Sequence, residues 1–221
     1  MPFVRIELAV MAVTDGRLDV LLGRRTGPPH EGRWALPGGV LRIDLDADLD
    51  AACQRVASER LGIELPNPLQ LETRGGRSRD PRAPWALSIV YRSVTLADGL
   101  QVAPGKRLSG LKWVDAEAAA ADSSLALDHA SLIAHAIEAL RAEVGALVFP
   151  PGLLPGTFTL GELQAASEAV LGRPLDKSSF RRRLDAARCV EAVEGEMRTG
   201  AFRPAQLYRL AAAAGRASLT G

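Results

Sequence analysis

The sequence is poor in the residues that build disulfide frameworks and metal sites. Its two cysteines, Cys53 and Cys189, lie far apart and match no disulfide framework or zinc spacing. Its three histidines, His30, His129 and His135, also lack ligand spacing, so we interpret each as a surface or packing residue. We therefore expect neither a disulfide-stabilised secreted domain nor a metal site built from these residues.

Long apolar runs are absent as well. No run of eighteen apolar residues occurs, which predicts no transmembrane helix and no membrane partner. The opening MPFVRIELAV lacks the basic start and apolar stretch of a secretory signal, so we expect a cytoplasmic protein. The net charge of +1 indicates no partner by itself. The 221 residues are 47% hydrophobic, enough for a sizeable core in one or two domains.

The stretch from Trp34 to Ile63 resembles the signature box of the Nudix family. Gly38-Gly39, Arg55 and Gly62 match the outer landmarks of that box. In the family, the intervening helix carries Arg-Glu-x-x-Glu-Glu, and its carboxylates hold magnesium against a diphosphate. The resemblance implies an α/β/α sandwich with a cleft beside this helix.

The interior of the box departs from the family pattern. Val56 stands in place of the first glutamate, Glu59 matches the second, and Arg60 replaces the third. These positions share one helix face, where magnesium would need several hard oxygen ligands. The preceding loop is also two residues longer than the family spacing. We therefore expect no catalytic residues, no metal and no required cofactor, while an ADP-ribose-type pyrophosphohydrolase with an accessory domain remains the alternative.

The longer loop reads DLDADLD, from Asp44 to Asp50. A calcium-binding EF-hand loop starting at Asp44 would need glycine and glutamate where Leu49 and Arg55 stand. We interpret the acids as caps for the following helix, because they precede and enter its first turn.

Several residues are candidates for binding a nucleotide in the cleft. Trp34 offers a ring for stacking, although a core position fits it equally, and arginine pairs well with phosphate oxygens. Arg60 would replace the missing magnesium by neutralising a diphosphate. The full candidate set is Arg24, Arg25, Trp34, Arg55, Glu59, Arg60 and Arg79.

Periodicity divides the chain into two parts. Alternating apolar residues predict strands at 3–13, 18–22, 87–96 and 111–114, and helical spacing predicts helices at 49–61, 116–121 and 130–144. Residues 74–82, RGGRSRDPR, are interpreted as a basic loop. FPPGLLPG at 149–156 marks a boundary, so we predict domains at 1–148 and 156–213.

The second part has the element order of a winged helix-turn-helix. TLGE at 159–162 is a capping box, Asp176 is a good N-cap for a second helix, and two short strands flank a tip near 198–204. Residues 151–221 carry a net charge of +3, against −2 for residues 1–150.

The helix DKSSFRRRLDAA is the predicted DNA-reading element. In helix-turn-helix proteins the second helix enters the major groove, and arginine recognises guanine. Phe180 and Leu184, four residues apart, should pack inward. The candidate DNA contacts, including two on the wing, are Lys177, Ser178, Ser179, Arg181, Arg182, Arg183, Arg198 and Arg203. The alternative is a solvated basic helix in a protein-binding domain.

Both parts together resemble the Nudix-related transcriptional regulators of NAD metabolism (the NrtR family). The matching segments are WALPGG at 34–39, RDPR at 79–82, LALDHA at 125–130, FTLGELQ at 158–164, LGRPLDKSSFRRRL at 171–184 and RPAQLYR at 203–209. The resemblance implies a homodimeric repressor that binds a palindromic operator in double-stranded DNA. It also implies that ADP-ribose or a related NAD-derived nucleotide is the effector. We expect the proline-rich linker at 149–156 to transmit the effector signal. A protein that both senses and hydrolyses its ligand is a further alternative.

Overall fold

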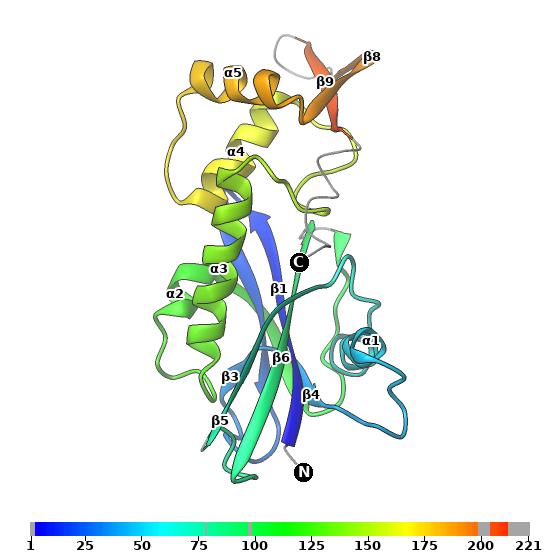
Figure 1. Cartoon of the computed structure of the whole chain (residues 1–221), viewed down its shortest axis with the longest axis vertical. Coiled ribbons are helices and arrows are strands. Elements are labelled where there is room, and N and C mark those ends of the chain that lie inside the picture. The colour runs from blue at the N-terminus through cyan, green and yellow to red at the C-terminus, as the bar shows by residue number, and fades with distance from the viewer. Residues whose placement is uncertain (1–2, 78, 97–98, 199–203, 212–221) are drawn as a thin grey trace.

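The computed structural model describes residues 3–77, 79–96, 99–198 and 204–211. Within these ranges, seven strands form one mixed sheet, two form a separate hairpin, and five helices accompany them. Figure 1 shows an elongated molecule with the sheet at one end and the hairpin at the other.

The large sheet is built around two long parallel strands, β1 (Phe3–Thr14) and β6 (Trp85–Leu96). A tight turn at Asp15-Gly16, where both residues have positive φ, joins β1 to β2 (Arg17–Arg25), as the turn residues predicted. The strand order is β3-β2-β1-β6-β5, with β4 pairing with β1 and β7 with β2. The remaining strands are β3 (Trp34–Ala35), β4 (Gly38–Val40), β5 (Leu69–Arg77) and β7 (Leu108–Asp115).

Helices cover both faces of this sheet, which confirms the predicted α/β/α sandwich. On one face, Leu8 and Val10 of β1 pack in a core with α1 (Leu49–Leu61). On the other, Ala9 and Met11 pack in a core with α2 (Ala116–Ala120) and α3 (His129–Gly145). The alternation follows from the strand period of two, which sends successive side chains to opposite faces.

The predicted winged helix is present after the sandwich. It comprises α4 (Leu160–Leu171), α5 (Lys177–Ala187), β8 (Val190–Arg198) and β9 (Ala205–Leu210). The capping box forms, because Glu162 N donates to Thr159 Oγ1 and Thr159 N donates to Glu162 Oε2. Asp176 caps α5 by accepting from Ser179 N, and Phe180 and Leu184 are buried, all as predicted.

The winged helix packs directly on the sandwich. Leu140 and Val144 of α3 share one continuous apolar core with Leu163 and Val170 of α4. Arg141 of α3 adds a hydrogen bond from Nε to the carbonyl oxygen of Val170, at 3.0 Å. The two parts of the chain are therefore joined by a common core and by polar contacts.

The segment between the two parts is folded against the sheet. Residues 146–159 form no helix or strand, yet Phe149, Leu153 and Phe158 are buried in the shared core. Gly152 has a φ of +87°, and a Cβ atom there would stand 2.2 Å from the carbonyl oxygen of Val94. Only glycine fits this close approach, so the linker is held in one position.

One predicted loop is wrong in part. Residues 74–77 belong to β5 instead, where they pair with β6, while residue 78 lies outside the described residues. The strand survives its two glycines because the ring of Trp85 lies over Gly75 and fills the space of the missing side chain. In the part of the chain that the structure describes, no helix has the length and apolar character needed to cross a membrane.

Candidate ligand pocket and nucleic-acid interface

Local signals fix the ends of the box helix α1. The carboxylate of Asp48 accepts from Ala51 N at 2.7 Å, and Gly62 ends the helix with a φ of 72°. Asp46 pairs with Arg55, whose Nε lies 2.6 Å from Oδ1, and Asp50 accepts from the Tyr91 hydroxyl. The acidic loop therefore caps the helix, as its sequence predicted, and the contacts of Asp46 and Asp50 hold it in place as well.

The positions that hold magnesium ligands in active Nudix enzymes serve other purposes here. Val56 is fully buried in the core beneath α1. Glu59 forms an ion pair with Lys106 at 3.1 Å. Arg60 donates from Nε to the carbonyl oxygen of Gly38 at 2.8 Å and from Nη1 to that of Lys106 at 2.9 Å. Among the described residues, no three His, Cys, Asp or Glu side chains are grouped so that they could hold a metal ion.

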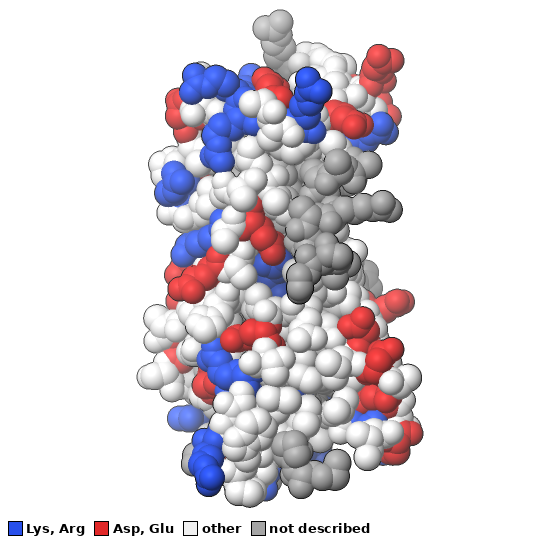
Figure 2. All heavy atoms as spheres, in the orientation of Figure 1, with Lys and Arg blue, Asp and Glu red and all other residues white. Residues whose placement is uncertain are grey.

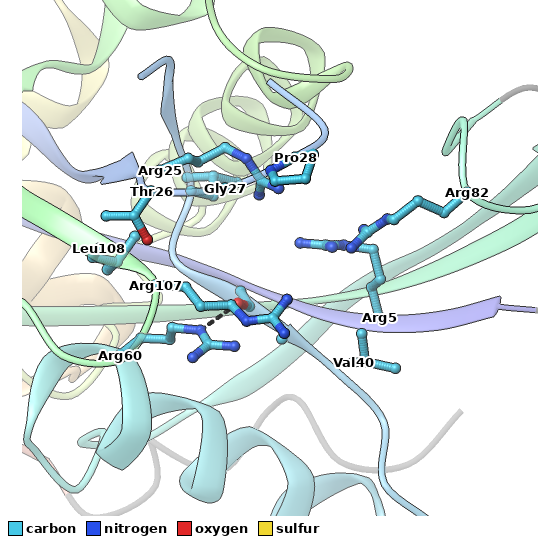
Figure 3. A pocket seen from close by; sticks show the side chains of 13 residues that line it. Arg5, Arg25, Thr26, Gly27, Pro28, Val40, Arg60, Arg82, Arg107 and Leu108 are labelled. Carbon is cyan, nitrogen blue, oxygen red and sulfur yellow. Dashed lines mark hydrogen bonds between the residues drawn. The ribbon is translucent and has the colours of Figure 1, made fainter. Parts of the chain in front are cut away.

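A cavity of about 310 Å³ lies between the end of α1 and the sheet. We call it the arginine pocket, because five arginines line it: Arg5, Arg25, Arg60, Arg82 and Arg107. Figure 3 shows their side chains reaching the same space from several sides, with β1, β2, α1 and two loops as their origins. Gly38, Gly39 and Val40 form part of its wall, so backbone as well as side chains faces the cavity.

The charge in the pocket is only partly balanced by the protein. Arg5 pairs with Glu7, and Arg82 pairs with Asp80. Among the described residues, Arg25 and Arg107 have no ion-pair partner. Burial, and then the nearby charge of Arg5, lower the pKa of Arg25. Crowded guanidinium groups repel one another in a partly desolvated site, so an anion placed among them would be strongly attracted.

A buried carboxylate lies beneath the arginines. Glu7 is fully buried on β1, and its Oε1 accepts from Arg5 Nε at 2.6 Å. Burial disfavours its charge, but the nearby positive charge of Arg5 outweighs that effect and lowers the pKa of Glu7 to about 2. A side chain at Gly38 would collide with Glu7 Oε2, which explains why glycine lines this wall.

The pocket brings together two of the seven predicted ligand residues, Arg25 and Arg60. The other five do not line it. Trp34 packs against the core that contains α2 and α3, with the ammonium group of Lys112 over its ring. Arg24 donates to the carbonyl oxygen of Gly32, and Arg79 forms an ion pair with Asp128. Arg55 and Glu59 pair with each other, with 3.4 Å between Nη1 and Oε2.

Sequence reasoning missed the other three pocket arginines. Arg5 is buried in β1, at a position where an apolar residue is expected. A charged residue at such a position indicates a functional role, so the sequence did contain a signal for Arg5. Arg82 belongs to the RDPR segment that carried part of the family resemblance. Arg107 reaches the pocket from a loop with no local sequence pattern to mark it.

The second candidate site is the outer surface of α5. Lys177, Ser178, Arg181 and Arg182 are exposed, and Ser179 is half-buried. Figure 2 shows Lys and Arg side chains gathered at the end of the molecule where Figure 1 places α5. This surface can offer donors to phosphates and bases, which is the property that DNA recognition requires.

Three other predicted DNA contacts have different surroundings. Arg183 donates from Nη2 to the carbonyl oxygen of Gly145 at 2.7 Å, at the end of α3. Arg198 on the wing strand pairs with Glu162. Arg203 lies outside the described residues.

Comparisons with known proteins match both parts of the chain. Residues 150–210 match the NrtR DNA-binding winged helix domain, and residues 5–136 match the NUDIX domain. A curated relative, the "ADPR responsive transcriptional repressor NtrR" of Acinetobacter baylyi, is 34% identical over 210 residues, covering 95% of this chain and 82% of the relative.

Solved structures from Shewanella oneidensis are similar as well. NrtR complexed with a 27mer DNA has a TM-score of 0.76 and 32% identity, covering 94% of this chain and 93% of that one. The NUDIX domain of the same protein complexed with ADP ribose has a TM-score of 0.56 and 30% identity, covering 63% of this chain and 89% of that one.

Proposed function

This chain belongs to the NrtR family of Nudix-related regulators, and from that premise we propose that it is a DNA-binding repressor of NAD metabolism genes controlled by ADP-ribose or a related NAD-derived nucleotide. The arginine pocket carries the proposal, because five guanidinium groups line it and one of them, that of Arg60, stands at the sequence position of a Nudix magnesium ligand. The relative's description as an ADPR responsive repressor and the Shewanella complexes with DNA and ADP ribose support it.

The diphosphate is expected to lie among Arg25, Arg60 and Arg107. Two phosphates bring about two negative charges, and guanidinium groups match phosphate oxygens in pairs. Arg60 keeps N–H groups available after its bonds to two carbonyls, since arginine has five donors. Arginine charge then replaces magnesium in binding the effector, and no cofactor is required.

We propose that the pocket binds this ligand without hydrolysing it at an enzymatic rate. A metal that polarises phosphoryl oxygens contributes several kcal/mol to the transition state, and Val56 and Arg60 replace two of its ligands. The alternative is a pyrophosphohydrolase that senses its own substrate. AMP release from ADP-ribose with magnesium separates the two, since turnover of about 1 s⁻¹ or faster would establish an enzyme.

For DNA binding we propose a homodimer on an inverted repeat. One small winged helix covers few base pairs, and two-fold symmetry doubles the contact. Lys177, Ser178, Ser179, Arg181 and Arg182 would contact the operator through α5, with Arg183, Arg198 and Arg203 as further candidates. Such a regulator acts on the chromosome, so we place it in the cytoplasm.

One experiment tests the whole proposal. The DNA upstream of the gene for this protein is titrated with the full chain, with and without ADP-ribose, while calorimetry measures ADP-ribose binding to the free protein. We expect sequence-specific binding whose dissociation constant changes with ADP-ribose and rises steeply with salt. An operator affinity that ignores ADP-ribose, or a monomer in sedimentation under binding conditions, would contradict the proposal.

A further inference from the structure

Helix α3 connects the arginine pocket region to the winged helix. Its first residue, His129, is fully buried beside β1, and its last residue, Gly145, accepts the hydrogen bond from Arg183 of α5. With a rise of about 1.5 Å per residue, its 17 residues span about 25 Å. Figure 1 shows α3 running along the molecule from the sheet toward α4 and α5.

The start of α3 is bonded to the wall of the pocket. Leu36 N, in that wall, donates to His129 Nδ1 at 2.8 Å. Ala126 N, just before the helix, donates to the carbonyl oxygen of Trp34 at 2.9 Å. Arg60 holds the same segment through Gly38. Direct hydrogen bonds therefore connect the wall of the pocket to the start of the helix.

The buried side chains of Glu7 and His129 lie close together in this region but form no hydrogen bond with each other. Because His129 Nδ1 accepts a hydrogen bond, the ring proton belongs on Nε2. His129 Nε2 lies 3.7 Å from Glu7 Oε1, which is too far for a hydrogen bond. Among the residues that the structure describes, neither His129 Nε2 nor Glu7 Oε2 has a hydrogen-bond partner, although both are buried. Buried polar atoms without partners are costly, so a small shift that joins them would be favoured.

Arg5 links this contact to the ligand site. It lines the pocket, and its Nε donates to the same Glu7 Oε1 that faces His129. An anion that draws the Arg5 guanidinium toward itself would weaken this bond. Glu7 would then be free to accept from His129 Nε2.

We propose that Glu7 and His129 are positioning residues that pass pocket occupancy to α3, which in turn moves α5 through Gly145 and Arg183. The inference rests on the proposed function, because it needs an anionic effector in the arginine pocket. It replaces the expectation that the linker transmits the signal, since the linker is packed into the shared core. In this proposal Glu7 and His129 transmit the signal and bind neither the effector nor the DNA.

The test is His129→Asn in the full-length protein. Asparagine Oδ1 can keep accepting from Leu36 N, while the Nε2 donor is lost. ADP-ribose is expected to change the operator dissociation constant of the wild type by about 5- to 150-fold, the usual range of allosteric coupling. In H129N we expect less than about a twofold change, with ADP-ribose affinity and effector-free operator affinity near wild type. His135→Asn, on the same helix but exposed, is the matched control and should keep the wild-type change.

A second variant decides the matter if H129N does not fold. Arg183→Met removes the side chain that donates to the Gly145 carbonyl oxygen, at an exposed position. For this variant the quantity compared with the wild type is the ratio of the operator affinities measured with and without ADP-ribose. We expect that ratio to fall toward one, while Arg181→Met keeps the wild-type ratio. A wild-type ratio in H129N or in R183M would overturn the relay and leave the proposed function intact. A wild-type protein that binds ADP-ribose without any change in operator affinity would overturn both.

Discussion

The Nε atom of Arg60 lies 2.8 Å from the carbonyl oxygen of Gly38 and donates a hydrogen bond to it. This bond joins the end of the box helix to the wall of the arginine pocket. Burial lowers the pKa of Arg60, while Glu59 acts in the opposite direction. The residue that replaces a magnesium ligand is thus held in place by backbone and remains available to an anion.

Replacing Arg60 with methionine should weaken ADP-ribose binding by about 10- to 150-fold. A hydrogen bond to a charged group contributes about 1.5–3 kcal/mol, and each 1.4 kcal/mol is a factor of ten in affinity. Calorimetric titration of ADP-ribose measures the effect. Arg24→Met is the control, because Arg24 is exposed and outside the pocket. Equal affinities of R60M and the wild type for ADP-ribose would show that Arg60 does not contribute to binding it.

Removing the side chain of Arg182 should weaken operator binding by about 1–3 kcal/mol if it makes a bidentate base contact. Arg182 is exposed on α5, and α5 is fixed by its buried residues Phe180 and Leu184. Gel-shift titration of R182A at two salt concentrations separates base from phosphate contacts, since losing a phosphate contact also lowers the salt slope. Arg42→Ala, in an exposed ion pair of the sandwich, should bind like the wild type.

The charge of Glu7 should stabilise the fold only above acidic pH. Its pKa is lowered to about 2 from an ordinary value of 4.5, so folding favours the ionised form. That contribution is complete above about pH 4.5 and is lost as the pH falls toward 2. Urea unfolding should be measured for the wild type and for Glu7→Gln across this window. The difference between their unfolding free energies should become smaller as the pH falls from about 4.5 to about 2. The exposed Glu64→Gln should parallel the wild type, and a constant difference for E7Q would contradict the assignment.

Alanine at position 152 should destabilise the protein by about 1–3 kcal/mol. The positive φ and the carbonyl oxygen of Val94 leave no room for a side chain, so the linker must shift. Chemical denaturation measures the loss. Gly156→Ala lies in the same segment, where a Cβ atom would meet no heavy atom of the described residues within 4 Å, and it should behave like the wild type. Equal stability of the two variants would mean that the linker is not held at Gly152.

Local patterns predicted the elements whose ends are set by local chemistry. The helix from Leu49 to Leu61 was predicted with the bounds it has, because Asp48 and Gly62 mark its ends. The strand β5 was not predicted, and its two glycines led residues 74–77 to be interpreted as a loop, because the ring of Trp85 that fills the space over Gly75 comes from the neighbouring strand. A pairing of that kind is a property of the folded sheet and leaves no trace in a short sequence window.

The pocket was predictable only in part for the same reason. Arg60 was marked by its place in the box, and Arg25 by its place after a strand. Arg5 and Arg107 come from segments about a hundred residues apart in sequence and meet only in the folded sheet. The predicted DNA-reading helix needed no such long-range information, because its amphipathic pattern and its cap lie within one segment.

The apolar core shared by α3 and α4 has a thermodynamic consequence. Leu163 and Val170 are covered by the sandwich, so cutting the chain within residues 146–159 would expose apolar surface on both pieces. At about 25 cal/mol per Å² of exposed apolar surface, neither piece keeps its full stability. The two parts match different family models but should melt in a single cooperative transition. Exchange of the winged helix between relatives would then succeed only if the matching side chains of α3 were exchanged with it.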